Sequence, residues 1–291
     1  MTNNEFDNEN EPWDLSLEPD SKWYALRLKQ IFRFKDLLFL FVRRDFVAVY
    51  KQTILGPIWF FIQPIITAGI FALVFGLFGS IPTEGMPTLL FYMCGITMWN
   101  YFSDTLTKTS DTFTANAGIF GKVYFPRMIV PLSIVISNLI KFVIQFCLFM
   151  VVWLYYFSTT DIIHPNIAIA LVPVLIIIMG FLGLGIGIII SSMTTKYRDL
   201  KFLIAFGIQL LMYASPIVFP LSLVMEKYPG FKYLLLANPI TSIIETFKYG
   251  FLGVGVFNWG YLAYSLGFTI VVFFLGLIVF NKVERSFMDT V

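Results

Sequence analysis

The sequence predicts an all-α polytopic membrane protein, from its composition and from the spacing of its charges. Of 291 residues, 58% are apolar and only 13% are charged, which is about half the charged fraction of a soluble globular chain. Uncharged, mostly apolar runs of 24 and 33 residues separate Lys201 from Glu226 and Lys248 from Lys282. Because about 20 apolar residues cross a bilayer core, a single soluble domain and a disordered chain are both excluded.

The chain is expected to begin with two segments that do not cross the membrane. Residues 1–21 carry seven acidic side chains and no Lys or Arg; they lack the basic start of a signal peptide and predict an acidic mobile tail. Residues 22–56 mix cations with bulky apolar side chains on different helical faces, which predicts a cytoplasmic amphipathic helix lying in the membrane interface. The sequence Leu55-Gly56-Pro57 is expected to end this helix.

The remaining residues, 57–291, are expected to form one domain with six transmembrane helices. Sixteen of the 20 Lys and Arg side chains fall on one side of these spans, eight of them before the first span. By the positive-inside rule, both termini are predicted to be cytoplasmic. The predicted spans are 57–79, 88–107, 129–157, 167–193, 202–220 and 260–280.

The outer connection between spans five and six, 221–259, is too long and too apolar for a plain loop. Asn238 can cap a helix that has Pro239 at its first position. At about 15 residues this helix is too short to cross, so we expect it to lie in the outer interface or to dip back into the membrane. A second short helix is expected at 221–234, broken at Pro229-Gly230. The longer helix has an apolar stripe of Ile240, Ile243, Ile244, Phe247 and Phe251, opposed by Thr241, Ser242, Glu245 and Lys248.

Residues that could carry catalysis are few. His164 is interpreted as a solvated or capping loop residue, and Cys94 and Cys147, in separate apolar runs, support neither a metal site nor a disulfide. Gly121-Lys122 lacks the flanking residues of a phosphate-binding loop. The sequence therefore predicts no enzyme and no cofactor or metal in this chain, and ATP-driven work would need a partner.

Small, polar and aromatic residues recur inside the predicted spans. Gly183, Gly185 and Gly187 are expected to let helices approach closely. Lys141 should face the bundle interior or water, because a charge at the bilayer centre costs ~2.5–3.5 kcal/mol. Polar stripes in spans one, three and five are either contacts between helices or the wall of a pathway, and spacing leaves both interpretations open. The aromatic face of span two either anchors the helix at the interface or stacks on sugar rings.

Three sequence motifs occur in an order that is typical of a known protein family. Residues 43–64 begin with RRD, continue through YKQTILGP and end with QP. Residues 116–127 have the sequence NAGIFGKVYFPR, and SPIVFP at 215–220 is followed by Asn238-Pro239. In this order, over roughly residues 35–285, they resemble the permease subunits of type-2 ABC polysaccharide exporters, the family that exports O-antigen and teichoic acid.

The resemblance implies a function. Such permeases form homodimers, pair with two ATP-binding cassette subunits that bind ATP and Mg, and move polymers linked to undecaprenyl pyrophosphate through a channel between the two permeases. We therefore expect a multi-pass exporter subunit of the bacterial inner membrane with O-antigen as its cargo. Export of teichoic acid or of a small amphiphile or drug stays open as an alternative, and a membrane glycan polymerase or glycosyltransferase is a further one.

The resemblance also implies three groups of site residues, and it makes the outer helices of 221–256 a gate. The lipid pyrophosphate would be received by Arg43, Arg44, Lys51, Leu55 and Gly56. The loop 108–128 would dock on the ATPase through Asn116, Gly118, Lys122, Tyr124 and Arg127. Candidates that line the channel are Trp59, Gln63, Thr67, Tyr92, Trp99, Phe102, Ser137, Lys141, Gln209 and Tyr213.

Overall fold

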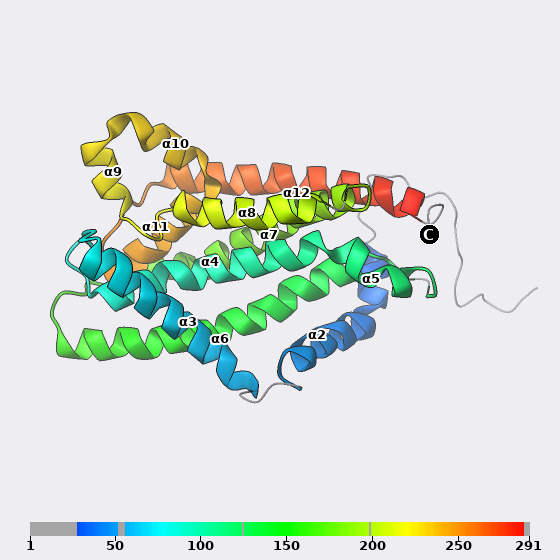
Figure 1. Ribbon diagram of the computed structural model, residues 1–291, viewed down its shortest axis with the longest axis horizontal. Coiled ribbons are helices and arrows are strands. Elements are labelled where there is room, and N and C mark those ends of the chain that lie inside the picture. Colours follow the sequence, from blue (N-terminus) through cyan, green and yellow to red (C-terminus); the bar gives the residue numbers. More distant parts are fainter. Residues whose placement is uncertain (1–27, 52–55, 124, 198, 288–291) are drawn as a thin grey trace, which may run out of the picture.

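The computed structural model describes residues 28–51, 56–123, 125–197 and 199–287, which form helices without strands (Figure 1). The predicted acidic tail 1–21 lies outside the described residues, as does Leu55. Within the described part, the helices α4, α6, α7, α8 and α12 run along the long axis of the molecule (Figure 1). Their bounds are α4 Thr88–Ser110, α6 Ile129–Thr159, α7 Val172–Thr194, α8 Leu200–Tyr213 and α12 Trp259–Phe287.

Four helical stretches in the described residues are long and apolar enough to cross a membrane, so the prediction of six spans is confirmed only in part. Two of the predicted spans correspond to helices that are not both long and apolar enough to cross a membrane. The second corresponds to α4, which is more polar and mostly buried, and the fifth to α8, whose 14 residues cover about 21 Å of a bilayer core of about 30 Å. The four stretches are Trp59–Phe78, Ile129–Thr159, Ile167–Thr194 and Trp259–Glu284.

The helix α7 forms the centre of the bundle and packs against α4 on one side and α12 on another. Its glycines make both contacts possible. A Cβ added at Gly187 would lie 2.6 Å from Thr109 Cβ on α4, and one at Gly185 would lie 2.9 Å from Phe273 Cα on α12. Such distances leave no room for a larger residue. The packing interpretation of Gly183, Gly185 and Gly187 is therefore confirmed.

The chain between α8 and α12 forms a short exposed part and a buried part. The exposed part, α9 Leu221–Lys227, η4 Pro229–Phe231 and α10 Lys232–Ala237, lies at one end of the molecule (Figure 1). The predicted break at Pro229-Gly230 is confirmed. The buried part is α11, Pro239–Leu252, where the side chain of Asn238 accepts a hydrogen bond from Ile240 N at 3.0 Å, as predicted.

The polar face of α11, opposite its apolar stripe, does not lie on the surface of the protein. Because α4, α7 and α12 surround the helix, its polar face is buried as completely as its apolar face. The polar groups are hydrogen-bonded inside the protein; for example, the hydroxyls of Ser242 and Ser265 lie 2.6 Å apart. This burial agrees with the predicted alternative in which the helix dips back rather than lying on the surface.

The N-terminal segment folds as α1, Leu28–Arg33, and α2, Lys35–Tyr50. The helix α2 packs obliquely along α6 (Figure 1), with Phe41 and Val42 buried and Phe39 and Leu40 exposed. After residues 52–55, η1, Gly56–Ile58, leads into α3, Trp59–Phe71, which continues as the π-helical η2, Ala72–Phe78. The end of α2 with Lys51 and the start of η1 at Gly56, which flank residues 52–55, are together called the α2–α3 corner below.

Candidate functional site

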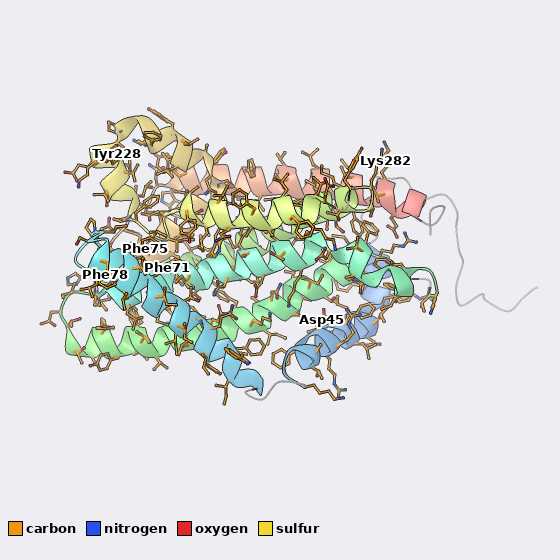
Figure 2. The ribbon with its side chains drawn as sticks, viewed as in Figure 1. Asp45, Phe71, Phe75, Phe78, Tyr228 and Lys282 are labelled. Carbon is orange, nitrogen blue, oxygen red and sulfur yellow. The ribbon has the colours of Figure 1, made fainter. Side chains whose placement is uncertain are left out.

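Two ends of the molecule can be distinguished by the side chains that they carry. Lys282 lies near one end, together with α5, Thr112–Phe120, whereas Tyr228 lies near the opposite end, beside α9 and α10 (Figures 1 and 2). They are called the α5 end and the α10 end. The residues predicted to contact an ATPase belong to the α5 end, and the residues predicted to bind a lipid headgroup lie on α2 and at the α2–α3 corner.

The predicted docking residues divide into exposed and buried ones. Gly118 and Lys122 are exposed. Asn116 is buried, and its side-chain amide donates to Thr112 O at 3.0 Å, within α5. Arg127 is also buried and donates from Nη1 to Glu284 O at 2.5 Å, so it attaches the loop to α12. Tyr124 lies outside the described residues.

Arg127 keeps its positive charge although its side chain is buried. Burial lowers the pKa of this guanidinium, and the nearby Glu284 carboxylate opposes that shift. Because a guanidinium is not deprotonated in proteins, Arg127 stays positive at physiological pH. Its guanidinium lies 5.5 Å from the centre of the Phe120 ring. Arg127 is therefore a residue that positions the loop rather than a surface contact.

Aromatic packing connects the loop after α5 to α2 and α12. The rings of Phe113 and Phe280 stack with centroids 4.6 Å apart. Phe125 lies 5.8 Å from Phe120 and 5.7 Å from Phe41 on α2. No spacing rule could identify this cluster in the sequence, because its members come from distant segments. It gives a packed connection from the exposed α5 loop to the helix that carries Arg43 and Arg44.

A second connection joins α5 to α7 and α8. Lys201, at the start of α8, forms an ion pair with Asp111 at 2.6 Å, just before α5. The amide of Phe113 donates to Ser191 Oγ at 3.2 Å, and Thr194 Oγ1 donates to Ser110 O at the same distance. These contacts fix α5 against the bundle.

Of the predicted headgroup residues, Arg43 and Arg44 lie on α2, and Lys51 and Gly56 lie at the α2–α3 corner. Arg43, Arg44 and Lys51 are exposed. Arg44 pairs with Asp45 at 2.8 Å and lies 4.6 Å from the centre of the Phe41 ring. Gly56 has φ of 52°, a left-handed conformation that favours glycine, and an added Cβ there would meet nothing within 4 Å.

Behind the corner, α4 and α6 meet along a polar seam. Asn100 Nδ2 donates to Gln145 Oε1 at 3.3 Å, and one helical turn further Lys141 Nζ lies 3.5 Å from Asp104 Oδ2. The side chain of Lys141 is 14% exposed and that of Asp104 is 45% exposed. The prediction that Lys141 faces the bundle interior or water is confirmed. Its partner was missed, because Asp104 lies 37 residues away in sequence and no local pattern relates the two.

The predicted channel residues are separated by the structure into buried and exposed groups. Tyr92, Trp99 and Phe102 belong to the core of the single chain, where the Tyr92 hydroxyl donates to Val218 O at 3.3 Å. Packing alone accounts for their burial, and their role in a channel stays a prediction. Ser137 is buried and Thr67 is half-buried, with its hydroxyl donating to Gln63 O. The exposed candidates are Trp59 and Gln63 on α3 and Gln209 and Tyr213 on α8.

A second ion pair, in α11, is fully enclosed. Lys248 Nζ lies 3.5 Å from Glu245 Oε1, with side chains 0% and 1% exposed. The ammonium also donates to Pro216 O at 2.5 Å and lies 3.9 Å from the centre of the Phe91 ring. Glu245 Oε2 accepts from Val256 N at 3.0 Å. This pair therefore joins α11 to the turn after α8, through Pro216, and to the loop after α11, through Val256.

Within the described residues, His, Cys, Asp and Glu side chains form no group of three or more that could hold a metal ion. His164 is exposed in the loop between α6 and η3, Ile167–Leu171. Cys94 is buried, Cys147 is exposed, and both are free thiols.

The helical architecture and the apolar stretches define a multi-pass membrane protein. The chain belongs to the ABC-2 type transporter family, whose family model matches residues 36–252. It is a transporter permease rather than an enzyme, and the family implies an ABC ATPase as its partner.

Curated relatives cover most of the chain. It is similar to the O-antigen export system permease protein RfbA of Klebsiella pneumoniae, with 29% identity over 257 residues, which are 87% of this chain and 94% of the relative. RfbA of Myxococcus xanthus is 26% identical over 223 residues, covering 76% of this chain and 82% of the relative. The polysialic acid transport protein KpsM of Escherichia coli is 25% identical over 269 residues, covering 88% of this chain and 95% of the relative.

Proposed function

We propose that this chain is the transmembrane subunit of an ATP-driven exporter that moves undecaprenyl-pyrophosphate-linked polysaccharide, with O-antigen as its cargo, across the bacterial inner membrane. The observation that carries this proposal is the set of exposed cations on α2 and at the α2–α3 corner, Arg43, Arg44 and Lys51. The printed names of the Klebsiella and Myxococcus relatives support the choice of cargo.

A pyrophosphate needs several cations and exposed N–H groups at the membrane interface. The exposed Arg43, Arg44 and Lys51 supply the cations, and the turn at Gly56 leaves its backbone accessible. The exposed apolar residues Phe39 and Leu40 on α2 would hold this helix in the lipid interface, as a lipid-binding segment requires.

In this proposal, 57–291 form the permease domain, with α4 and α8 as its second and fifth spans and with both termini cytoplasmic. Two copies pair and work with two ATP-binding cassette subunits. The helix α8 supports pairing because it packs only lightly against its own chain and exposes a row of large apolar side chains. Those residues are Phe202, Leu203, Phe206 and Leu210.

The exposed Gly118 and Lys122 would contact the ATPase. A push on this loop would reach α2 through Phe125 and Phe41 and reach α8 through the Asp111–Lys201 pair. The exposed helices α9 and α10, together with α11, would close the pathway at the α10 end.

The proposal is tested by Arg44→Ala in cells that depend on this exporter for surface polysaccharide. Lys227→Ala, an exposed cation at the α10 end, is the matched control. We expect Arg44→Ala to lower surface polysaccharide several-fold, with membrane insertion and ATPase association unchanged, and Lys227→Ala to behave as the wild type. Unchanged surface polysaccharide in Arg44→Ala would overturn the headgroup assignment.

The cargo is tested separately with the purified permease and ATPase in vesicles. Lipid-linked O-antigen should stimulate ATP hydrolysis and be transported. If only a small amphiphile is transported, or if the permease alone processes a lipid-linked sugar without the ATPase, the proposed function fails.

A further inference from the structure

A cluster of charged side chains lies behind the α2–α3 corner, on the protein side of the predicted headgroup residues. Lys141 on α6 faces Asp104 on α4, and Lys108, one helical turn from Asp104, interacts electrostatically with Lys141, Asp104 and Asp45. Asp45 lies on α2 in the angle between α2 and α6 (Figure 2). Lys108, Asp104 and Lys141 are called the inner lysine cluster.

The inner lysine cluster has more positive than negative charge among its described side chains. Asp104 lies 3.5 Å from Lys141 and also attracts the ammonium of Lys108. Asp45, the other nearby carboxylate, is already paired with Arg44 at 2.8 Å. The Lys141–Asp104 distance of 3.5 Å is longer than the 2.7–2.9 Å typical of a strong charged hydrogen bond. Two neighbouring ammonium groups repel each other, so the cluster favours an additional anion.

An unused hydrogen-bond donor lies next to the cluster. Ser137 is one helical turn before Lys141 on the same face of α6, and its side chain is 3% exposed. Its hydroxyl has no hydrogen-bond partner within the described part of the chain. A buried polar group without a partner costs free energy, and a ligand oxygen at this point would remove that cost.

The surroundings of the cluster suit the headgroup of a lipid. Phe60, at the start of α3, has its ring centre 5.7 Å from Lys141 Nζ, and it stacks with Phe46 of α2 at 5.7 Å. These rings pack beside Lys141 and supply an apolar neighbour for a lipid headgroup. The cluster still opens to the outside on one side, because the Asp104 side chain is 45% exposed.

We propose that the inner lysine cluster is a second binding site for a phosphate or pyrophosphate group, which the lipid headgroup occupies after its capture at Arg43 and Arg44. This inference rests on the proposed function. Lys108 and Lys141 bind the phosphate oxygens, and Asp104 occupies the lysines until the headgroup arrives. The carboxylate competes with the ligand, so its removal strengthens binding.

Because Asp104 competes with the ligand for the lysines, substitutions at the lysines and at Asp104 distinguish a ligand site from a structural ion pair. If the pair were only structural, neutralising the lysine and neutralising the carboxylate would change anion binding in the same direction. In a ligand site, Lys141→Gln and Lys108→Gln weaken anion binding, whereas Asp104→Asn tightens it. Lys141→Arg keeps the charge and should retain most of the binding.

The experiment uses the full chain with its ATPase partner in nanodiscs of neutral lipid. Binding of farnesyl pyrophosphate and, separately, of inorganic pyrophosphate is measured by calorimetry, and thermal unfolding verifies that each variant is folded. Lys196→Gln, an exposed lysine elsewhere at the α5 end, is the matched control. We expect each lysine-to-glutamine change in the cluster to raise Kd about 10-fold or more, as expected for a lost charged hydrogen bond. Asp104→Asn should lower Kd, and Lys196→Gln should leave it unchanged.

Each outcome decides the proposal. Unchanged Kd in both lysine variants, or weaker binding in Asp104→Asn, overturns the second site; if Arg44→Ala still lowers export, the proposed function survives that failure. Binding of inorganic pyrophosphate alone, with the expected lysine dependence, supports an anion site and contradicts its occupation by the lipid headgroup. If farnesyl pyrophosphate binds with the expected dependence on Lys108 and Lys141 and Arg44→Ala does not alter export, the cluster stands and the headgroup assignment at the corner fails.

Discussion

Two lysine–carboxylate pairs in this protein have the same separation and opposite surroundings. In α11, Lys248 and Glu245 lie 3.5 Å apart with at most 1% of either side chain exposed. Between α4 and α6, Lys141 and Asp104 also lie 3.5 Å apart, yet the carboxylate is 45% exposed. Lys248 has a carbonyl and an aromatic ring as further partners, whereas Lys141 has a second lysine beside it.

This difference in exposure and in neighbouring charges indicates whether an ion pair stabilises the fold or can bind a ligand. A fully enclosed pair contributes to a fixed structure, because removing either charge leaves the other without solvation. A pair that is open to solvent and has an excess of one charge can exchange its partner for a ligand at little cost to the fold. We therefore expect the α11 pair to maintain the α10 end and the α4–α6 pair to serve binding.

The largest effect is expected at Lys248. Lys248→Met leaves the buried Glu245 carboxylate unpaired, and breaking a buried pair in this way costs about 3–5 kcal/mol of folding stability. Thermal unfolding in detergent, followed by the loss of monodisperse protein on gel filtration, measures the change.

The control is the double variant Glu245→Gln and Lys248→Met, which removes both charges and should recover most of the lost stability. If Lys248→Met unfolds at the wild-type temperature, the pair is not structural and the comparison fails.

An intermediate effect is expected at Lys141. Because the Lys141–Asp104 pair is partly solvated, Lys141→Met should change the stability by no more than about 1 kcal/mol, measured by the same unfolding assay. A loss of stability as large as that of Lys248→Met would show that this pair, too, is structural.

The smallest effect is expected at Lys201. The side chains of its ion pair with Asp111 are 38% and 41% exposed, so Lys201→Gln should cost only ~0.5 kcal/mol, and that cost should shrink at high salt because solvent ions screen exposed charges. Unfolding at low and at high salt measures both quantities, and a cost that does not depend on salt would contradict this assignment.

Much of the fold follows from local sequence patterns. Hydropathy places four of the apolar spans, because crossing a bilayer imposes a length and a composition on a single segment. The cap of α11 at Asn238 and the close packing at Gly185 were also predicted, since each depends on one residue type with a specific steric or hydrogen-bonding property. The candidate site was predicted less completely: the exposed cations of α2 are visible in the sequence, but Asp104 and Lys108 were not assigned to it.

Only the tertiary structure decided which polar residues are buried and with which partners. Helical periodicity placed Glu245 and Lys248 opposite the apolar stripe and left their burial open, whereas the structure shows that neighbouring helices enclose that face and supply its hydrogen bonds. Lys141 was predicted to face the interior, but its partner comes from a different helix. By itself, the sequence determined a helical membrane protein whose few cations gather on one side of the predicted spans, with a recognisable family pattern. The packing of α4, α6 and α11 decided which charges are enclosed and which stay open, because pairing across helices depends on distances in space that local sequence does not encode.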